Sequence, residues 1–195
     1  KVAIVTGANK GIGLALVRSL CSQFKGDVYL TARNPKLGEE AVKVLKEQEG
    51  LSPLFHQLDI NDMQSIRTLR DFMKKKYGGI DVLINNAGIA FKAADRTPFG
   101  IQAETTLKTN FFATRDVSNE LLPLIKPGWP NTAYGVSKIG VTVLSRIQAR
   151  SINEKRNGDG ILLNACCPGW VRTDMAGPNT KSPDEGAETP VYLAL

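Results

Sequence analysis

Strand-like and helix-like segments alternate along most of the chain, and this alternation limits the fold more than any other feature of the sequence. Short runs rich in Val, Ile and Leu are each followed by a longer stretch in which apolar residues recur every three or four positions. Such alternation predicts βα units stacked around a parallel sheet. We therefore expect an α/β fold of three layers, αβα, in a single domain over residues 1–195. The expected strands cover residues 2–5, 28–30, 54–58, 81–84 and 161–165, and the expected helices cover about 12–24, 38–48, 66–73, 105–125, 134–152 and 184–195.

The alternation breaks once, shortly before Tyr134. Only the seven residues from Pro127 to Ala133 separate Lys126 from Tyr134, where a helical pattern resumes. A buried strand takes ~5–6 residues and each of its connections ~2–6, so no strand is expected in this interval. One βα unit is therefore expected to be missing.

The net charge of +6 could suit nucleic acid or an acidic surface. The basic residues are scattered, however, and their densest run, Lys74 to Lys76, falls at the expected end of a helix, where cations complement the helix dipole. We therefore expect no nucleic-acid partner. No apolar run reaches the ~18 residues of a membrane span, and no signal-peptide pattern opens the chain, so we expect no membrane association.

The three cysteines cannot form a disulfide framework. Cys166 and Cys167 are adjacent, and Cys21 is one apolar position of a helical stripe. Unpaired thiols are typical of a reducing compartment, so we expect a cytoplasmic protein.

A glycine-rich turn connects the first expected strand to the first helix. It has the sequence Thr-Gly-Ala-Asn-Lys-Gly-Ile-Gly over residues 6–13. Glycines at such a turn let the backbone approach a pyrophosphate, whose charge meets the free N–H groups and the positive dipole end of the helix. A merely tight turn is the alternative, but the position directly after a strand favours a dinucleotide site. The residues expected to hold the cofactor here are Gly7, Asn9, Lys10, Gly11, Ile12 and Gly13.

The Thr-Gly-x-x-x-Gly-x-Gly spacing of this turn resembles that of the short-chain dehydrogenase/reductases, and the resemblance covers essentially the whole chain. It implies a Rossmann-type doubly wound parallel sheet. Asn-Asn-Ala-Gly at residues 85–88 looks like the family motif that closes around the adenine and ribose, and Asp59-Ile60 matches the acidic position near the adenine amino group. The resemblance therefore implies cofactor contacts from Asp59, Ile60, Asn86, Ala87 and Gly88.

The end of the second strand indicates which nicotinamide cofactor binds. Enzymes that use NAD place an acidic residue there for the ribose 2′-hydroxyl, whereas the 2′-phosphate of NADP needs a cation. This chain has Thr31-Ala32-Arg33 at that point and Lys10 in the glycine turn. We therefore predict NADPH/NADP+ as the cofactor, with Arg33 and Lys10 as phosphate ligands. An exposed arginine without a role is the alternative.

Tyr134 and Lys138 form the Tyr-x-x-x-Lys pair of the family. A spacing of four would place both side chains on one face of a helix. A phenol has a free pKa of ~10, and a neighbouring ammonium lowers that pKa by favouring the phenolate. Tyr134 would then protonate the oxygen of a carbonyl that receives hydride from NADPH, and Lys138 would also hold the nicotinamide ribose.

Two further segments match family motifs. Asn110, beside Phe111-Phe112, matches the asparagine that props open its helix and holds a water linking the lysine to a proton relay. Residues 167–174 resemble the Pro-Gly segment after the sixth strand, where backbone groups and Thr173 hold the carboxamide. The cofactor contacts implied in this segment are Pro168, Gly169, Val171 and Thr173. The expected substrate contacts are Trp170, Met175, Phe91 and Gln102, with core packing as the alternative for Trp170.

Shorter segments at residues 51–53, 89–92, 165–170 and 186–192 are similar to the monomeric NADPH-dependent carbonyl reductases. That subfamily reduces quinones, aromatic aldehydes and ketones, and some prostaglandins and steroids. The resemblance implies a small carbonyl substrate and a monomer. It also maps to Cys167 the cysteine linked to glutathione adducts, although a buried structural thiol is an equal alternative.

The chain departs from the family where the βα unit is missing. The family's catalytic serine lies on strand five, and no serine lies between Asn119 and Tyr134. The same interval carries a helical insertion that favours a monomer in carbonyl reductases, so the oligomeric state stays open. Either the molecule has residues that this sequence lacks, or it is an internally deleted form. In a deleted form we expect strand four to be left unpaired or to pair directly with strand six.

Three functions are weighed against one another. The first is an NADPH-dependent carbonyl reductase. The second is a catalytically inactive NADP(H)-binding module, which the absent serine favours because one oxyanion donor contributes ~10²–10³ to turnover. The third, nucleic-acid binding, has no motif to support it.

Overall fold

The computed structural model describes residues 1–92, 94–125, 130–134, 145, 148–149, 152, 162–166, 171–172 and 180–194. Its strands are β1 (Val2–Val5), β2 (Asp27–Ala32), β3 (Leu54–Gln57), β4 (Val82–Ile84), β5 (Pro130–Tyr134) and β6 (Leu162–Cys166). Its helices are α1 (Gly11–Gln23), α2 (Pro35–Glu49), α3 (Met63–Tyr77), α4 (Phe99–Leu107), the π-helical η1 (Lys108–Ala113), α5 (Thr114–Leu121), the 3₁₀ turn η2 (Leu122–Leu124) and α7 (Pro183–Ala194). The expected α/β class is confirmed.

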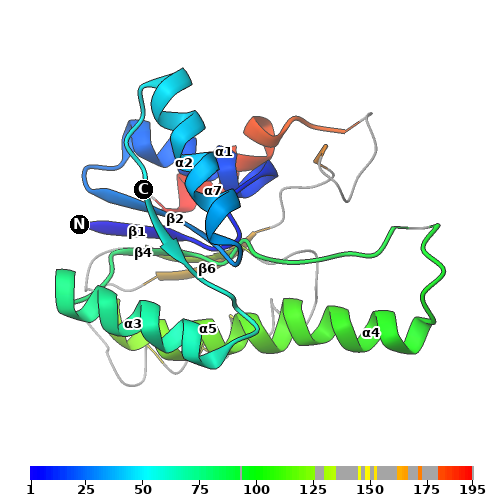
Figure 1. Cartoon of the computed structure of the whole chain (residues 1–195). Helices are drawn as coiled ribbons and strands as arrows, with labels where there is room; N and C mark the ends of the chain where they lie inside the picture. The colour runs from blue at the N-terminus through cyan, green and yellow to red at the C-terminus, as the bar shows by residue number, and fades with distance from the viewer. Residues whose placement is uncertain are drawn as a thin grey trace.

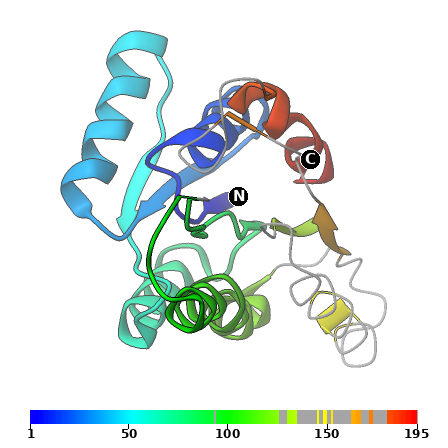
Figure 2. The same ribbon diagram turned by 90° about the vertical axis from the view of Figure 1, so that its right-hand side faces the viewer.

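A parallel sheet of order β3-β2-β1-β4-β5-β6 forms the middle layer. In Figure 1, α1, α2 and α7 cover one face of the sheet, and α3 and α5 cover the other. The helix α4 is continuous with α5 through η1 and extends beyond the sheet. Figure 2 shows the same three layers from the side. Two apolar cores result, because a sheet with helices on both faces buries alternate side chains in opposite directions. This arrangement is the predicted doubly wound, three-layer fold.

Local signals explain where the helices begin and end. Asn34 accepts a hydrogen bond from the Leu37 N–H and Pro35 fits the first helical position, so α2 begins earlier than expected. α3 ends at Gly78 in the left-handed conformation, and its last turn carries the three lysines, as expected. The helical rod of α4, η1 and α5 also begins earlier than predicted, at Phe99 directly after Pro98.

The prediction that no strand fits before Tyr134 is wrong. β5 lies between β4 and β6, with Thr132 opposite Ile84 and all five of its residues paired with β6. The chain re-enters the sheet at Ile125, which forms a parallel bridge with Ile80 just before β4. The open edge of β4 needs a partner for its backbone groups, and the next residues supply it. Strand four is therefore neither unpaired nor joined directly to strand six, because Pro130 to Tyr134 provide the strand between them.

Pro130 is compatible with this use, because the first residue of a strand is one of the places where a missing N–H is tolerated. The formation of β5 changes the place of Tyr134. We expected this residue to begin a helix, but it is the last residue of β5. A residue cannot be in a strand and in the first turn of a helix at once.

Candidate cofactor and active site

The candidate site lies where the strand order reverses between β1 and β4. The chain leaves β1 toward β2 on one side and reaches β4 on the other, so the loops after these two strands diverge at the carboxyl edge of the sheet. In open α/β sheets ligands bind in the crevice at such a switch point. The glycine turn follows β1, and the Asn-Asn-Ala-Gly motif follows β4. The fold therefore brings together two motifs that are almost 80 residues apart in the sequence.

Hydrogen bonds between Thr6 and Asn86 join these loops. The Thr6 hydroxyl Oγ1 accepts from the backbone N–H groups of Asn86 and Ala87, both at 3.0 Å. The Asn86 side-chain Nδ2 donates to the carbonyl oxygens of Thr6 and Gly7, both at 2.9 Å. Both loops are thus fixed relative to each other through buried or half-buried polar groups. Thr6 was not among the predicted site residues, although a threonine between a buried strand and a glycine turn is the signal that could have identified it.

The glycines of the turn are needed for close approach. Gly7 has φ +60°, and a Cβ there would lie 2.8 Å from the Ala87 Cα. A Cβ on Gly13 would lie 2.5 Å from the Asn86 Nδ2 and 2.7 Å from the Ala8 Cα. Any larger residue at either position would push the β4 loop away. The two glycines therefore let the β4 loop pack directly against the turn, beside the N-terminus of α1.

The beginning of α1 presents its N–H groups beside this turn. Lys10 is the N-cap in extended conformation, and the N–H groups of Gly11, Ile12 and Gly13 precede the first N–H that bonds within the helix, that of Leu14. Asn9 is half-buried in the turn and the Lys10 side chain is exposed. The helix dipole adds partial positive charge at this end. This geometry suits a pyrophosphate.

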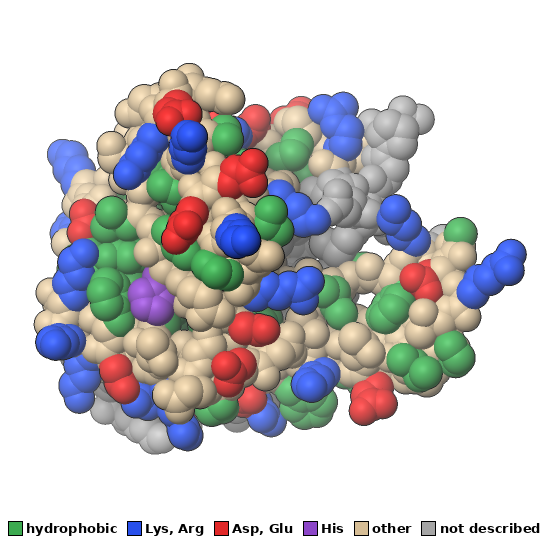
Figure 3. Space-filling view, viewed as in Figure 1, with side chains coloured by type: hydrophobic (Ala, Val, Ile, Leu, Met, Phe, Trp, Pro, Cys, Tyr) green, Lys and Arg blue, Asp and Glu red, His purple; other side chains and the backbone are tan. Residues whose placement is uncertain are grey.

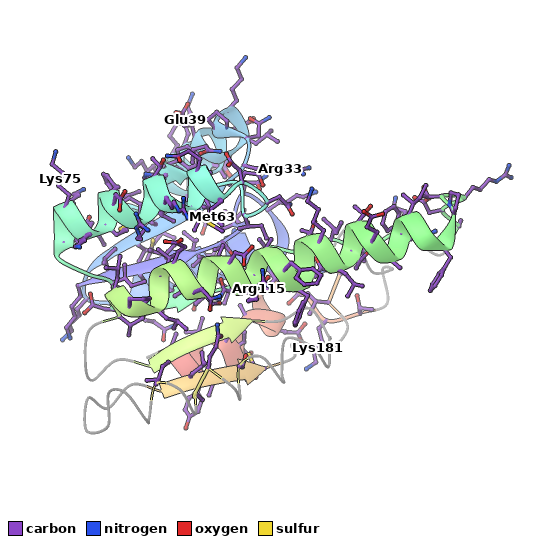
Figure 4. The ribbon with its side chains drawn as sticks, turned by 90° about the horizontal axis from the view of Figure 1, so that it is seen from below. Arg33, Glu39, Met63, Lys75, Arg115 and Lys181 are labelled. Atoms are coloured by element: carbon purple, nitrogen blue, oxygen red, sulfur yellow. The ribbon has the colours of Figure 1, made fainter. Side chains whose placement is uncertain are left out.

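Arg33 lies beyond the end of β2 with an exposed side chain. Figure 4 shows Arg33 and Met63 near the middle of the molecule and Lys75 at its left-hand end. The Arg33 carbonyl accepts a hydrogen bond from the Gln57 side chain at 3.3 Å, which fixes the backbone beside β3. Elsewhere Lys and Arg are spread over the visible surface (Figure 3). No acidic side chain occupies the end of β2, where a 2′-hydroxyl of NAD would need one.

Asp59 and Ile60 follow β3 at the same edge. The Asp59 Oδ1 accepts from the Asn61 N–H at 2.9 Å, and the Ser65 hydroxyl and the Asp59 N–H lie 3.0 Å apart. Ile60 is buried in the core beneath α3. Ala87 and Gly88 are half-buried at the neighbouring strand end. Apart from Tyr134 and Val171, the described members of the predicted cofactor set thus lie at the ends of β1, β2, β3 and β4.

The family model for short chain dehydrogenases matches residues 1–184. The chain belongs to the short-chain dehydrogenase family. Carbonyl reductase [NADPH] 1 of Macaca fascicularis is 58% identical over 252 positions, with 100% of this chain and 91% of the relative covered. Carbonyl reductase [NADPH] 3 of Mus musculus is 53% identical over 252 positions, with 100% of this chain and 91% of the relative covered. Carbonyl reductase [NADPH] 1 of Oryctolagus cuniculus is 54% identical over 252 positions, with the same coverage.

Solved structures support the same fold. A dehydrogenase/reductase from Sinorhizobium meliloti 1021 has a TM-score of 0.83 at 23% identity, covering 99% of this chain and 87% of the other. A short chain dehydrogenase from Burkholderia cenocepacia J2315, in complex with NADP, has a TM-score of 0.80 at 24% identity, covering 99% and 90%. At these identities the likeness concerns the fold alone.

The alignment with the macaque relative is longer than this chain, at 252 positions against 195 residues. The relative therefore has internal residues without a counterpart here. This agrees with the predicted loss of residues, and the dehydrogenase sheet nevertheless keeps a strand between β4 and β6.

Asn110, the family asparagine, is buried in η1, the π-helical part of the rod. Its Oδ1 accepts from the Ile89 N–H at 2.8 Å, and its Nδ2 donates to the Ile89 carbonyl at 2.7 Å. The side-chain amide thus pairs with the backbone N–H and carbonyl of one residue of the β4 loop. A π-helical turn widens the helix and shifts its carbonyl groups out of the regular ladder. Asn110 thus lies in a π-helical segment, and its role in opening the helix stays a prediction.

A second polar contact from the rod was not predicted. The Asn85 Nδ2 donates to the Ser118 Oγ at 3.1 Å, and this hydroxyl donates to the Thr114 carbonyl at 2.8 Å. Both side chains are buried. They tie the end of β4 to α5, so the two asparagines after β4 bond in opposite directions, one to the rod and one to the glycine turn. No sequence spacing connects Asn85 with Ser118, because only the packing of α5 against the sheet brings them together.

Tyr134, the predicted proton donor, is at the carboxyl edge of the sheet but in an unexpected element. Tyr134 is the last residue of β5, paired with Cys166 of β6. Lys138 lies outside the described residues, as do Pro168, Gly169, Trp170, Thr173, Met175 and Cys167. The predicted shared helical face of Tyr134 and Lys138 is therefore wrong for Tyr134.

The remaining predicted residues that the structure describes lie outside the glycine turn, on other segments of the chain. Val171 is buried, bridges Lys181 and contacts Gly186 of α7. Phe91 is half-buried in the segment after β4. Gln102 lies in α4, where its side-chain amide donates to the Thr97 carbonyl at 2.7 Å and holds the chain that enters the helix.

Within the described residues, no helix is both long and apolar enough to cross a membrane. The same residues contain no group of three or more His, Cys, Asp or Glu side chains that could hold a metal ion.

Proposed function

We propose that this protein is an NADPH-dependent carbonyl reductase. The observation that carries the proposal is the pair of hydrogen-bonded contacts between the glycine turn and the Asn-Asn-Ala-Gly loop, beside the N–H groups at the beginning of α1. The relatives named carbonyl reductase [NADPH] support the choice of reaction and cofactor.

In this proposal the cofactor is held as the family holds it. The pyrophosphate binds at the α1 N-terminus, and Lys10 and Arg33 bind the 2′-phosphate. Asp59 and Ile60 contact the adenine, and the loop of Asn86 to Gly88 closes over the ribose. Pro168, Gly169, Val171 and Thr173 would hold the carboxamide, and NADPH supplies the hydride when bound.

Tyr134 would donate the proton to the substrate oxygen, with Lys138 lowering the pKa of the phenol by favouring the phenolate. The Asn110 side chain already bonds Ile89 at both ends, so the water that serves the lysine would bind a main-chain carbonyl of η1 instead. This assigns Asn110 a positioning role.

Quinones, aromatic aldehydes and ketones, and some prostaglandins or steroids are the proposed substrates, with Trp170, Met175, Phe91 and Gln102 near them. Cys167 would carry any glutathione adduct. A cytoplasmic location is supported by the free thiol of Cys21. The monomeric state implied by the resemblance depends on an insertion that this chain lacks, so we do not carry it over.

A second candidate function is NADP(H) binding without turnover. β5 favours it, because Tyr134 ends a strand that the sheet needs and so cannot begin the helix that would bring Lys138 beside it. The cofactor half of the site does not depend on this segment.

The test is NADPH oxidation with menadione, with NADH in parallel and cofactor binding followed by the fluorescence of the reduced nicotinamide. Turnover with NADPH well above NADH supports the reductase. NADPH binding without turnover supports the second candidate. Arg33→Ala should weaken NADPH binding at least about tenfold while leaving NADH binding nearly unchanged, because one charge-assisted phosphate contact is lost. Equal loss for both cofactors contradicts the role of Arg33.

A further inference from the structure

Asp59, Ser65, Gln57 and Arg33 form a hydrogen-bonded network across the carboxyl ends of β3 and β2. The Asp59 backbone N–H donates to the Ser65 Oγ of α3 at 3.0 Å. The Ser65 hydroxyl donates to the Gln57 Oε1 at 3.0 Å, and the Gln57 Nε2 donates to the Arg33 carbonyl at 3.3 Å. The network therefore connects the residue expected beside the adenine with the backbone of the residue expected to bind the 2′-phosphate.

The bonds of this network run in one direction. The Arg33 carbonyl can only accept, so the Gln57 amide turns its Nε2 toward Arg33 and its Oε1 toward Ser65. The Asp59 N–H can only donate, so the Ser65 oxygen accepts that bond and the Ser65 proton is directed to Gln57. Ser65 is buried in the first turn of α3. The Gln57 amide is thus oriented from the helix side and matched to the Arg33 carbonyl.

Arg33 lies just past the β2–β3 ladder, whose last pair is Ala32 with Gln57. The next helix, α2, begins at Pro35, so Arg33 is in the short bend between strand and helix. Its side chain is exposed. An exposed arginine has many rotamers, and the backbone sets the point from which the guanidinium reaches a ligand. The bond from Gln57 therefore fixes the base of the Arg33 side chain where the ladder has ended.

We propose that Gln57 is a positioning residue for the 2′-phosphate, and that it favours NADP(H) over NAD(H) by holding the Arg33 backbone. The inference rests on the proposed function, since it requires a dinucleotide at this edge of the sheet. Ordering a loop and a long side chain on binding weakens affinity, and a bend that is already held loses less entropy. NAD(H) has no 2′-phosphate and gains nothing from a fixed Arg33. The effect of Gln57 is therefore specific to the phosphorylated cofactor.

Gln57→Met tests this role, because methionine keeps the length of the side chain but cannot donate to the Arg33 carbonyl. Binding of NADPH and of NADH is followed by the fluorescence of the reduced nicotinamide. The dissociation constant for NADPH should rise about three- to tenfold, as expected for one lost hydrogen bond, and that for NADH should change less than about twofold. Gln64→Met, the same change at an exposed position of α3, is the matched control and should alter neither constant.

A double-variant cycle separates positioning from a general structural role. With Arg33→Ala already present, Gln57→Met should change NADPH binding by less than about twofold, because the side chain that Gln57 positions is gone. A merely structural role would instead weaken both cofactors alike, with and without Arg33, and that result overturns the proposal.

The same titrations distinguish this proposal from the proposed function. If Arg33→Ala weakens NADPH binding and Gln57→Met does not, the role of Gln57 is overturned and the proposed function stands. If the unaltered chain does not bind NADPH, both are overturned. Selective loss of NADPH binding in Gln57→Met, absent from Gln64→Met, supports both.

Discussion

Asn110 is the residue that most directly couples the rod to the cofactor edge of the sheet. The Oδ1 of its buried side chain accepts from the Ile89 N–H, and its Nδ2 donates to the Ile89 carbonyl. Asn110→Ala would leave that N–H and carbonyl without their partner, and we expect the free energy of unfolding to fall by about 3 kcal/mol. Urea denaturation measures this. Gln48→Ala in α2 removes an exposed amide and should change it by less than about 0.5 kcal/mol. Similar losses for the two variants would contradict the clamp.

Cys21 shows how burial controls the chemistry of a single thiol. Its position in α1 against the core raises the pKa of the thiol to about 11. At pH 8 the folded chain should therefore alkylate at Cys21 about a hundredfold more slowly than the urea-unfolded chain, because only the thiolate reacts. Peptide mapping by mass spectrometry separates Cys21 from the other two cysteines. Equal rates in the two states would refute the burial.

The same raised pKa fixes the sign of a pH effect. The neutral thiol is favoured in the folded state. Below pH 9 the thiol is protonated in the folded and the unfolded chain, so Cys21 does not make the free energy of unfolding depend on pH there. Stability should then fall as the pH rises from about 9 to about 11, because the unfolded chain loses its proton first.

At the scale of elements, α7 shows how a short helix is held at the end of the described chain. Ser182 and Glu185 form a capping box, in which the Ser182 hydroxyl accepts from the Glu185 N–H at 3.2 Å and the Glu185 carboxylate accepts from the Ser182 N–H at 2.6 Å. The helix then packs against α1, and Gly186 fits closely against Val171, since a Cβ there would lie 2.6 Å from the valine Cγ2.

Ser182→Ala should lower the free energy of unfolding by about 1 kcal/mol, because α7 loses its cap. The matched control is Ser22→Ala in α1, where the exposed hydroxyl bonds only the Arg18 carbonyl one turn back, and we expect less than about 0.5 kcal/mol. The backbone hydrogen bond from Ser182 lowers the pKa of Glu185. The contribution of Glu185 should therefore be present above its usual pKa and disappear as the pH falls through the lowered pKa. Denaturation at pH 7 and at pH 3 measures both effects, and a cap effect no larger than the control would contradict the capping box.

At the scale of the whole molecule, β5 includes Tyr134, which the proposed reductase needs at the beginning of a helix. Restoring the internal segment of the carbonyl reductase relatives after Lys126 would give the sheet another strand and release Tyr134 to begin a helix. We expect menadione turnover to rise at least about 10²–10³-fold, since an oxyanion donor alone contributes that much. A Gly/Ser insertion of equal length is the control and should give no such rise. An unaltered chain as active as the restored one would show that β5 does not limit catalysis.

The sequence by itself determined the layers, the order of the elements and the cofactor edge. Periodicity predicts each βα unit because burial selects apolar residues at the spacing of a strand or a helix, and the glycines at 7 and 13 are required wherever a backbone must approach Ala87 or Asn86 this closely. The bonds of Thr6 to the β4 loop and of Asn85 to Ser118 were not predictable, since they join residues that only packing brings together.

The use of Pro130 to Tyr134 as β5 was decided by the tertiary structure alone. Locally these residues precede a helical pattern, and the family resemblance assigns Tyr134 to that helix. The open edge of β4, however, has backbone groups that must be paired, and the chain emerging beside Ile80 is the segment placed to pair them. A requirement of the whole sheet thus overrides a local preference, because an unpaired buried peptide group costs more than a misplaced turn of helix.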